Sequence, residues 1–184
     1  MCITLATVIL QVLNIKMIGN PFSYHRNIFL EDILWQGFTP TLVHINWSHW
    51  LLNMINFYMI IIFFNGVWNG WILIQLFTLG SLFILLMLYL FNPSIEQYAG
   101  MSGVLYTLVV YGVIKIYNKQ KFLSIIIGVL ILIKLLMDAK INHFMGVDIF
   151  LISVNVIIDV HWYGTIFSLL FISIEYSIIE YKKR

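Results

Sequence analysis

Charged side chains are scarce in this chain of 184 residues, of which Asp, Glu, Lys and Arg together make up 10%. Soluble domains typically contain about 25% charged residues. Apolar residues reach 61% of the chain, more than a water-soluble fold of this size can bury. The composition therefore predicts an integral membrane protein in a lipid bilayer. It disfavours the alternative, an unusually apolar soluble helical bundle.

Cysteine is nearly absent as well. Cys2 has no partner cysteine, so no disulfide can form within the chain and the sequence gives no signal of a redox compartment. The start of the chain lacks the basic segment and the small-residue cleavage site of a signal peptide, so we expect its first apolar run to be retained as a helix. The net charge of +2 is too small to indicate a nucleic-acid partner.

Long apolar runs dominate what is present. A membrane-spanning helix needs about 20 mostly apolar residues, and continuous runs indicate helices rather than the alternating pattern of membrane strands. We predict an all-α polytopic membrane protein, a single domain of residues 1–184 that forms a bundle of six transmembrane helices. Their approximate ranges are 1–18, 44–64, 71–91, 99–117, 122–137 and 156–174.

The placement of lysine and arginine predicts the orientation. The tail 182–184 is basic, and so is the short connection that holds Lys119 and Lys121. Six crossings put both on one side, so we expect both termini in the cytoplasm. The acidic residues then assigned to outer loops are Glu31, Asp32, Glu96, Asp138 and Asp148.

Two connections, 19–43 and 138–155, are long for so small a protein. Long loops in compact proteins tend to be functional. The second contains the apolar stretch 149–154, which indicates a segment that lies on the membrane or dips into it.

Three groups of polar residues lie at membrane depth, where such side chains are costly and usually carry function. The first runs from His44 through His49 to Asn53 at the start of the second span. His49 and Asn53 are about 40° apart on one helix face. His44 is about 140° from His49 and belongs to the turn before the helix. Taken alone, His44 could also be an interfacial residue.

The second group, Gly100, Ser102 and Gly103, opens the fourth span. Glycines allow close backbone approach, and the start of a helix offers free N–H donors. Ser102 is therefore a candidate nucleophile whose own amide can bind a developing oxyanion. The alternative is a patch of small residues that serves helix packing.

The third group, Asp159, His161 and Gly164, lies near the outer end of the sixth span. His161, Gly164 and Ser168 follow i, i+3, i+7 spacing and share one face. Small residues allow this face to pack tightly on a neighbouring helix, so that the histidine points into the contact. Taken alone, a histidine there is more often structural.

Together the three groups supply a nucleophile, a base and oxyanion donors, all near the outer ends of spans. A Ser–His pair does not require an aspartate. The H-E-x-x-H pattern of one class of zinc enzymes is absent, and no two aspartates lie in mid-span. We predict a serine hydrolase site without a metal or another cofactor.

This pattern resembles the rhomboid family of intramembrane serine proteases over about residues 35–168. The H-x-x-x-x-H-x-x-x-N motif of that family is matched by His44, His49 and Asn53. Its G-x-S-G motif is matched by Gly100, Ser102 and Gly103, and its H-x-x-G motif by His161 and Gly164. The resemblance implies that Ser102 is the nucleophile and His161 its general base. It implies an oxyanion hole of His49, Asn53 and the Ser102 amide, and a supporting Tyr106 that packs against the catalytic histidine.

The short length and the run from Trp35 to His49 look most like the rhombosortase branch. That likeness implies an endopeptidase of the bacterial inner membrane that cleaves single-span anchors, such as C-terminal anchors that begin with Gly-Gly, near the outer face. Two positions depart from the rhomboid pattern: Trp35 is followed by Gln36 instead of arginine, and Ser168 replaces the last glycine of G-x-x-x-G.

A catalytically silent rhomboid-like protein that binds transmembrane segments is the alternative. Such proteins normally lose the serine or the histidine, and this chain has both. A transporter is disfavoured, because the chain shows no inverted repeats.

Overall fold

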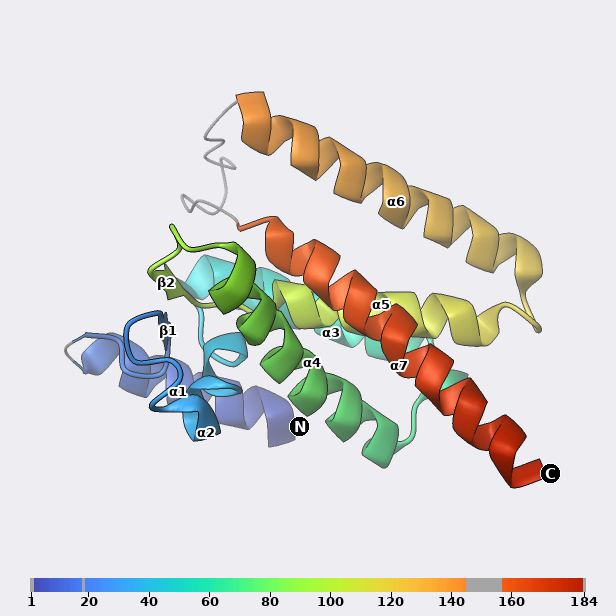
Figure 1. Ribbon diagram of the computed structural model, residues 1–184, viewed down its shortest axis with the longest axis horizontal. Coiled ribbons are helices and arrows are strands. Elements are labelled where there is room, and N and C mark those ends of the chain that lie inside the picture. The colour runs from blue at the N-terminus through green and yellow to red at the C-terminus, as the bar shows by residue number, and fades with distance from the viewer. Residues whose placement is uncertain (1, 18, 145–156, 184) are drawn as a thin grey trace.

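The computed structural model describes residues 2–17, 19–144 and 157–183 (Figure 1). Helices make up most of this part of the chain, and the two strands contain two residues each, so the predicted all-α class is confirmed. The elements are α1 (Cys2–Lys16), β1 (Tyr24–His25), α2 (Ile33–Gln36), the 3-10 helix η1 (Thr39–Thr41), α3 (Trp47–Phe63), the 3-10 helix η2 (Asn65–Val67), α4 (Gly70–Phe91), β2 (Gln97–Tyr98), α5 (Ser102–Ile116), α6 (Lys121–Phe144) and α7 (Asp159–Lys183).

Asparagine caps fix where two of the long helices begin. The side-chain oxygen of Asn46 accepts the backbone N–H of His49 at 2.7 Å, and that of Asn69 accepts the N–H of Ile72 at 2.8 Å. Each cap satisfies a donor of the first turn that has no partner within the helix. Because Asn46 caps α3, His44 lies in the connection before that helix, whereas the predicted span included it.

Helix α5 lies at the centre of the bundle and packs against α3, α4, α6 and α7 (Figure 1). Leu108 and Tyr111 of α5 are fully buried and belong to one core cluster with Leu76 and Ile84 of α4. Lipid is as apolar as leucine, so helix association in a bilayer depends on close packing more than on removal of apolar surface from water. A central α5 therefore needs small residues where its neighbours approach.

Small residues bring α5 and α7 into backbone contact. A Cβ added to Gly164 would collide with the carbonyl oxygen of Gly103, and one added to Gly103 would lie 2.9 Å from the carbonyl oxygen of Val160. The Thr107 hydroxyl donates a hydrogen bond to the carbonyl oxygen of Gly164 at 3.1 Å. Ser168 is fully buried on the same helix, so the serine in the last position of the G-x-x-x-G pattern is accommodated.

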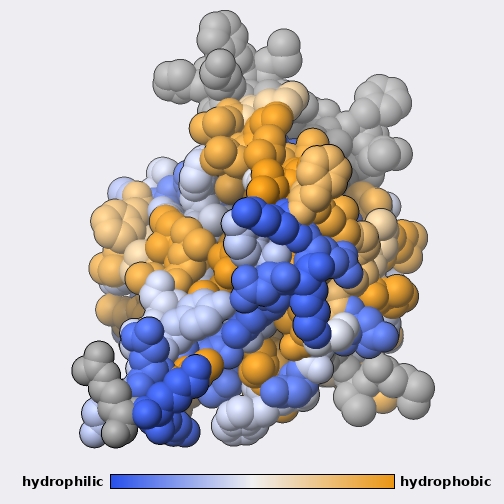
Figure 2. Space-filling model, turned by 90° about the vertical axis from the view of Figure 1, so that its right-hand side faces the viewer, coloured by the Kyte–Doolittle hydropathy of each residue, from blue (hydrophilic) through white to orange (hydrophobic). Residues whose placement is uncertain are grey.

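The sides of the bundle are apolar. Figure 2 looks onto the end that carries the C-terminus and shows hydrophilic residues running from the middle to the lower left edge, with hydrophobic ones above them and on both sides. Within the described residues, α4 and α7 are each long and apolar enough to cross a membrane. Shorter apolar helices are Thr4–Lys16, Trp47–Phe63 and Ser102–Ile116. An apolar surface of this extent on a mainly helical chain fits a lipid surrounding.

The last two long helices differ from their predicted bounds. Helix α6 continues to Phe144, so the prediction that Asp138 lies in an outer loop is wrong: it is a buried residue of the helix. The helix can hold this carboxylate because Lys134, one turn earlier, pairs with it. Helix α7 extends to Lys183, beyond the predicted end at 174. The apolar stretch 149–154 lies outside the described residues.

The loop 19–43 is tied to the loop before α5 by a short antiparallel ribbon, in which Tyr24 of β1 lies opposite Tyr98 of β2.

Gln36 stands where the resemblance leads one to expect arginine. Its side chain is fully buried, and its oxygen accepts the backbone N–H of His25 at 3.0 Å. The glutamine thus fixes β1 through a neutral hydrogen bond.

Candidate active site

Ser102 is the first residue of α5 and is partly exposed. The N–H groups of a first helical turn have no acceptors within the helix, so they are available to a ligand. Gly100, two residues earlier, has φ +151°, a conformation that L side chains rarely adopt. Its N–H donates to the carbonyl oxygen of Pro40 at 2.9 Å, which anchors the loop before Ser102 to η1.

Tyr98 also holds this loop. Its hydroxyl donates to the carbonyl oxygen of Gly100 at 2.7 Å. Burial raises the pKa of the Tyr98 phenol, and hydrogen bonding to the nearby Ser102 side chain and Gly103 amide lowers it only in part. The hydroxyl is therefore a protonated donor at neutral pH. Sequence reasoning missed this residue, although a tyrosine four positions before the serine was visible in the sequence.

His161 lies in the first turn of α7 and is 6% exposed. Its ring stacks on that of Tyr106, with ring centroids 4.4 Å apart and planes 22° apart. Tyr106 lies four residues after Ser102 and hence on the same face of α5. The imidazole of His161 is therefore held against the face of α5 that carries Ser102.

Neither ring nitrogen of His161 has a hydrogen-bond partner among the described residues. The Ser102–His161 hydrogen bond of a working dyad is thus not formed in this state. Catalytic hydrogen bonds are often long without substrate and shorten only in the substrate complex. Nδ1 of His161 lies 3.6 Å from a carboxylate oxygen of Asp138 on α6, within ion-pair range.

Asp159, whose role the sequence left open, has a different partner. Its carboxylate accepts a hydrogen bond from the Asn92 amide at 2.6 Å, and the Tyr163 hydroxyl donates to the side-chain oxygen of Asn92, also at 2.6 Å. These bonds fasten the start of α7 to the C-terminal end of α4. The carboxylate beside His161 is Asp138.

His49 lies beside the loop that precedes Ser102. A Cβ added to Gly100 would lie 2.9 Å from Cε1 of His49, so the glycine allows this approach. One turn later on α3, the buried Asn53 amide donates to the carbonyl oxygen of His49 at 2.9 Å. The second N–H of that amide remains available for a further acceptor.

His44 packs edge-on against His49, with ring centroids 5.1 Å apart, and is 1% exposed. The side chain of Gln11 on α1 binds both backbone groups of His44: its oxygen accepts the N–H at 2.6 Å and its amide donates to the carbonyl at 2.7 Å. Helix α1 therefore positions His44. Sequence reasoning missed Gln11, whose signal was an amide in the middle of an apolar run.

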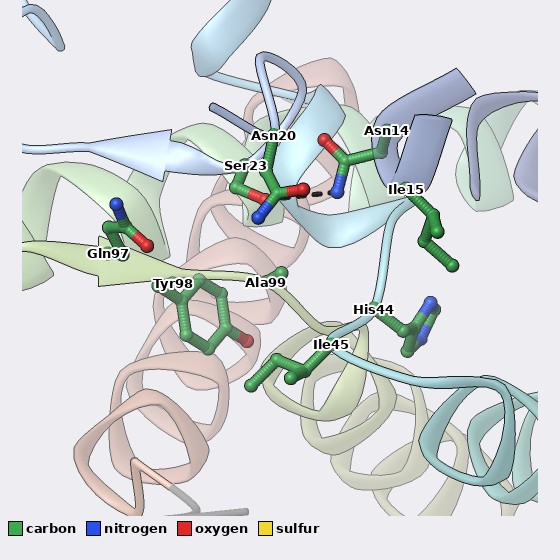
Figure 3. A pocket seen from close by; sticks show the side chains of 9 residues that line it. All are labelled: Asn14, Ile15, Asn20, Ser23, His44, Ile45, Gln97, Tyr98 and Ala99. Atoms are coloured by element: carbon green, nitrogen blue, oxygen red, sulfur yellow. Dashed lines mark hydrogen bonds between the residues drawn. The ribbon is translucent and has the colours of Figure 1, made fainter. Parts of the chain in front are cut away.

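A pocket of about 180 Å³ lies beside His44, between the end of α1, the β1–β2 ribbon and the start of α3 (Figure 3). Tyr98 and Ala99 form the wall nearest the serine loop, and Asn14 donates to the Ser23 hydroxyl at 3.2 Å in the opposite part. The lining is partly polar, so the pocket can hold water. Residues 97–99 of its lining are three to five positions before Ser102 along the chain.

The structure brings the sequence-predicted residues together in two sets. In the first set, Gly103 of α5 contacts Gly164 of α7 and Tyr106 stacks on His161, with Ser102 one turn before Tyr106 on the same helix face. In the second set, Gly100 lies beside His49, which packs against His44 and is hydrogen-bonded to Asn53. Among the described residues, no three His, Cys, Asp or Glu side chains are grouped so that they could hold a metal ion.

Apolar helices enclose serine, histidine and asparagine side chains at one end. This arrangement defines the class of the protein, an integral membrane protein with a buried polar site. A comparison with protein-family models matches the rhomboid domain over residues 31–177, most of the chain. The chain therefore belongs to the rhomboid family, whose members are generally intramembrane serine proteases acting on transmembrane substrates in the bilayer. Neither the comparison with curated proteins nor that with solved structures finds a match.

Proposed function

We propose that the chain is an intramembrane serine endopeptidase in which Ser102 is the nucleophile and His161 the general base. The stacking of His161 on Tyr106 carries this proposal, because it holds the imidazole on the Ser102 face of α5. Contact between Gly103 and Gly164 supports it, since these glycines let α5 and α7 approach closely beside the two groups.

The reaction follows from these positions. Nε2 of neutral His161 accepts the proton of the Ser102 hydroxyl as its oxygen attacks the carbonyl carbon of the scissile peptide bond. The Ser102 amide, His49 and Asn53 donate to the oxyanion that develops. His161 then gives its proton to the leaving amine, and a water molecule hydrolyses the acyl-enzyme. The polar pocket beside His44 offers a route for that water.

The proposed substrates are single-span membrane anchors, including C-terminal anchors of the Gly-Gly type processed by the rhombosortase branch. A helical peptide carbonyl is hydrogen-bonded within its helix, so the substrate must unwind locally before attack. Glycine at the cleavage site lowers the cost of unwinding, because it is a poor helix former. His44 and Gly100 support the site rather than react.

We place the protein in a bacterial inner membrane, crossed six times, with both termini cytoplasmic and cleavage near the outer face. The turn between α5 and α6, which holds Lys119, lies at the same end of the bundle as the C-terminus (Figure 1). The Lys115–Glu175 ion pair of 2.9 Å joins α5 and α7 towards that end. The clustering of basic residues there supports a cytoplasmic assignment.

Cleavage of a membrane-embedded model substrate tests the proposal. We expect Ser102→Ala and His161→Ala to abolish cleavage of a single-span peptide with a Gly-Gly pair at its outer end. Ser173→Ala, which removes an exposed serine of α7, is the matched control and retains activity. Cleavage by Ser102→Ala at the wild-type rate would contradict the proposal. Binding of the peptide without cleavage by the wild type would favour a catalytically silent relative.

A further inference from the structure

Asp138 lies on the one face of α6 that turns towards the bundle. This face comprises Ser124, Gly128, Ile131, Leu135 and Asp138, spaced four, three, four and three residues apart as on one side of a helix. Ser124, Leu135 and Asp138 are buried, whereas residues between them are largely exposed. The carboxylate therefore points inwards because of its helical position.

A buried carboxylate is costly unless it is paired or hydrogen-bonded. Lys134 supplies one partner, with its ammonium nitrogen 2.6 Å from each carboxylate oxygen. The Lys134 side chain is 59% exposed, so it reaches the carboxylate from the rim of the bundle. On the inner side the carboxylate faces His161, whose Nδ1 is 3.6 Å from Oδ2, and Tyr106, which also interacts electrostatically with it.

We propose that Asp138 is a positioning residue for His161: its carboxylate accepts the Nδ1–H and thereby leaves Nε2 to accept the Ser102 proton. This proposal rests on the proposed serine-protease function. It deepens that function by adding a carboxylate from a third helix to the serine and histidine of α5 and α7.

The surroundings of His161 favour this assignment. Its ring plane is fixed by Tyr106 of α5, so a rotation about the stack decides which nitrogen faces Ser102. Asp159, the acid in the first turn of the same helix as His161, is engaged by Asn92 at the end of α4. Asp138 therefore supplies the carboxylate that selects the tautomer, which is how an orienting acid acts on a catalytic histidine.

Steady-state cleavage by the full-length protein in lipid vesicles tests the proposal. We expect Asp138→Asn to lower kcat by at least about 10-fold with KM nearly unchanged, because the amide permits the wrong tautomer. Asp138→Glu should recover much of the loss. Asp159→Asn, the same change on the same helix as His161, is the matched control and should stay within about twofold of wild type.

A purely structural role as the counter-ion of Lys134 predicts something different. In that case the double variant Asp138→Asn, Lys134→Gln should regain activity, because it removes the unpaired lysine along with the aspartate. The positioning role predicts that the double variant remains as slow as Asp138→Asn.

Nitrogen NMR of histidine-labelled protein adds a direct readout of the tautomer. The His161 signal, assigned by its loss in His161→Gln, should show the Nδ1–H tautomer in wild type and a mixture of tautomers in Asp138→Asn.

Activity of Asp138→Asn near the wild-type level, or rescue in the double variant, would overturn the positioning role and leave the protease intact. If Ser102→Ala cleaves like wild type, it is the protease function that fails.

Discussion

The ring of Tyr106 lies almost parallel to that of His161, with centroids 4.4 Å apart. The two residues come from helices far apart in sequence, and the contact is possible because Gly103 and Gly164 let those helices touch nearby. Aromatic stacking of this kind contributes about 0.5–1.5 kcal/mol beyond the area that it buries. The stack therefore limits the orientations open to the imidazole.

Removal of the Tyr106 ring should release the histidine. We expect Tyr106→Ala to lower kcat by about 2- to 10-fold, the kinetic equivalent of a lost stack. Tyr106→Phe keeps the ring and should retain most of the activity. Equal losses in the two variants would show that the hydroxyl, rather than the stacked ring, matters.

The backbone contact between α5 and α7 should be intolerant of a single methyl group. Gly164→Ala places a Cβ against the Gly103 carbonyl oxygen and should destabilise the protein by about 1–3 kcal/mol, with loss of cleavage. Gly128→Ala on α6 is the matched control, because its Cβ would meet a methyl of Val113 at an ordinary 3.8 Å. Thermal unfolding in detergent measures both, and a Gly164→Ala protein as stable as Gly128→Ala would contradict the contact.

Gly100 should be needed for activity more than for folding. Gly100→Ala combines an unfavourable φ of +151° with a Cβ 2.9 Å from the His49 ring, so both the serine loop and His49 must shift. We expect a large loss of kcat with a folded protein, judged by its gel-filtration profile. Gly66→Ala, where no atom lies within 4 Å of the added Cβ, should behave as wild type. Full activity of Gly100→Ala would show that His49 is not part of the oxyanion hole.

Asn53 should contribute to the rate without being indispensable. Loss of one oxyanion donor costs about 10²–10³ in kcat in a serine protease, so Asn53→Ala should leave weak activity where Ser102→Ala leaves none. Asn56→Ala, an exposed asparagine on the same helix, provides the comparison. If the kcat of Asn53→Ala equals that of Asn56→Ala, Asn53 is not an oxyanion donor.

Relationships within one helix were accessible from the sequence. His49 and Asn53 are one turn apart, and their shared face follows from helical geometry alone. The same holds for Ser102 with Tyr106 and for His161 with Gly164. Apolar run length was likewise sufficient to locate six of the helices approximately, because each long apolar run corresponds to one helix of the structure.

Contacts between distant segments did not follow from helical geometry, and the packing of Tyr106 on His161 was expected from the family resemblance alone. Asp138 was assigned to a loop because a carboxylate at the end of an apolar run usually marks its edge, and its neighbour His161 is supplied by another helix. The pairing of Tyr24 with Tyr98 joins segments more than 70 residues apart, too short a ribbon to leave an alternating pattern. Gln11 and Asn92 act through such long-range bonds too.

The most direct test of the account is covalent labelling of the purified protein with a fluorophosphonate probe, followed by mass spectrometry of the modified peptide. An activated serine attacks the phosphorus, loses its proton to the base and displaces fluoride, so labelling requires both proposed groups. We predict a single adduct on Ser102 in wild type and none in His161→Ala. No labelling of wild type, or labelling that is unchanged in His161→Ala, would contradict a Ser102–His161 catalytic pair.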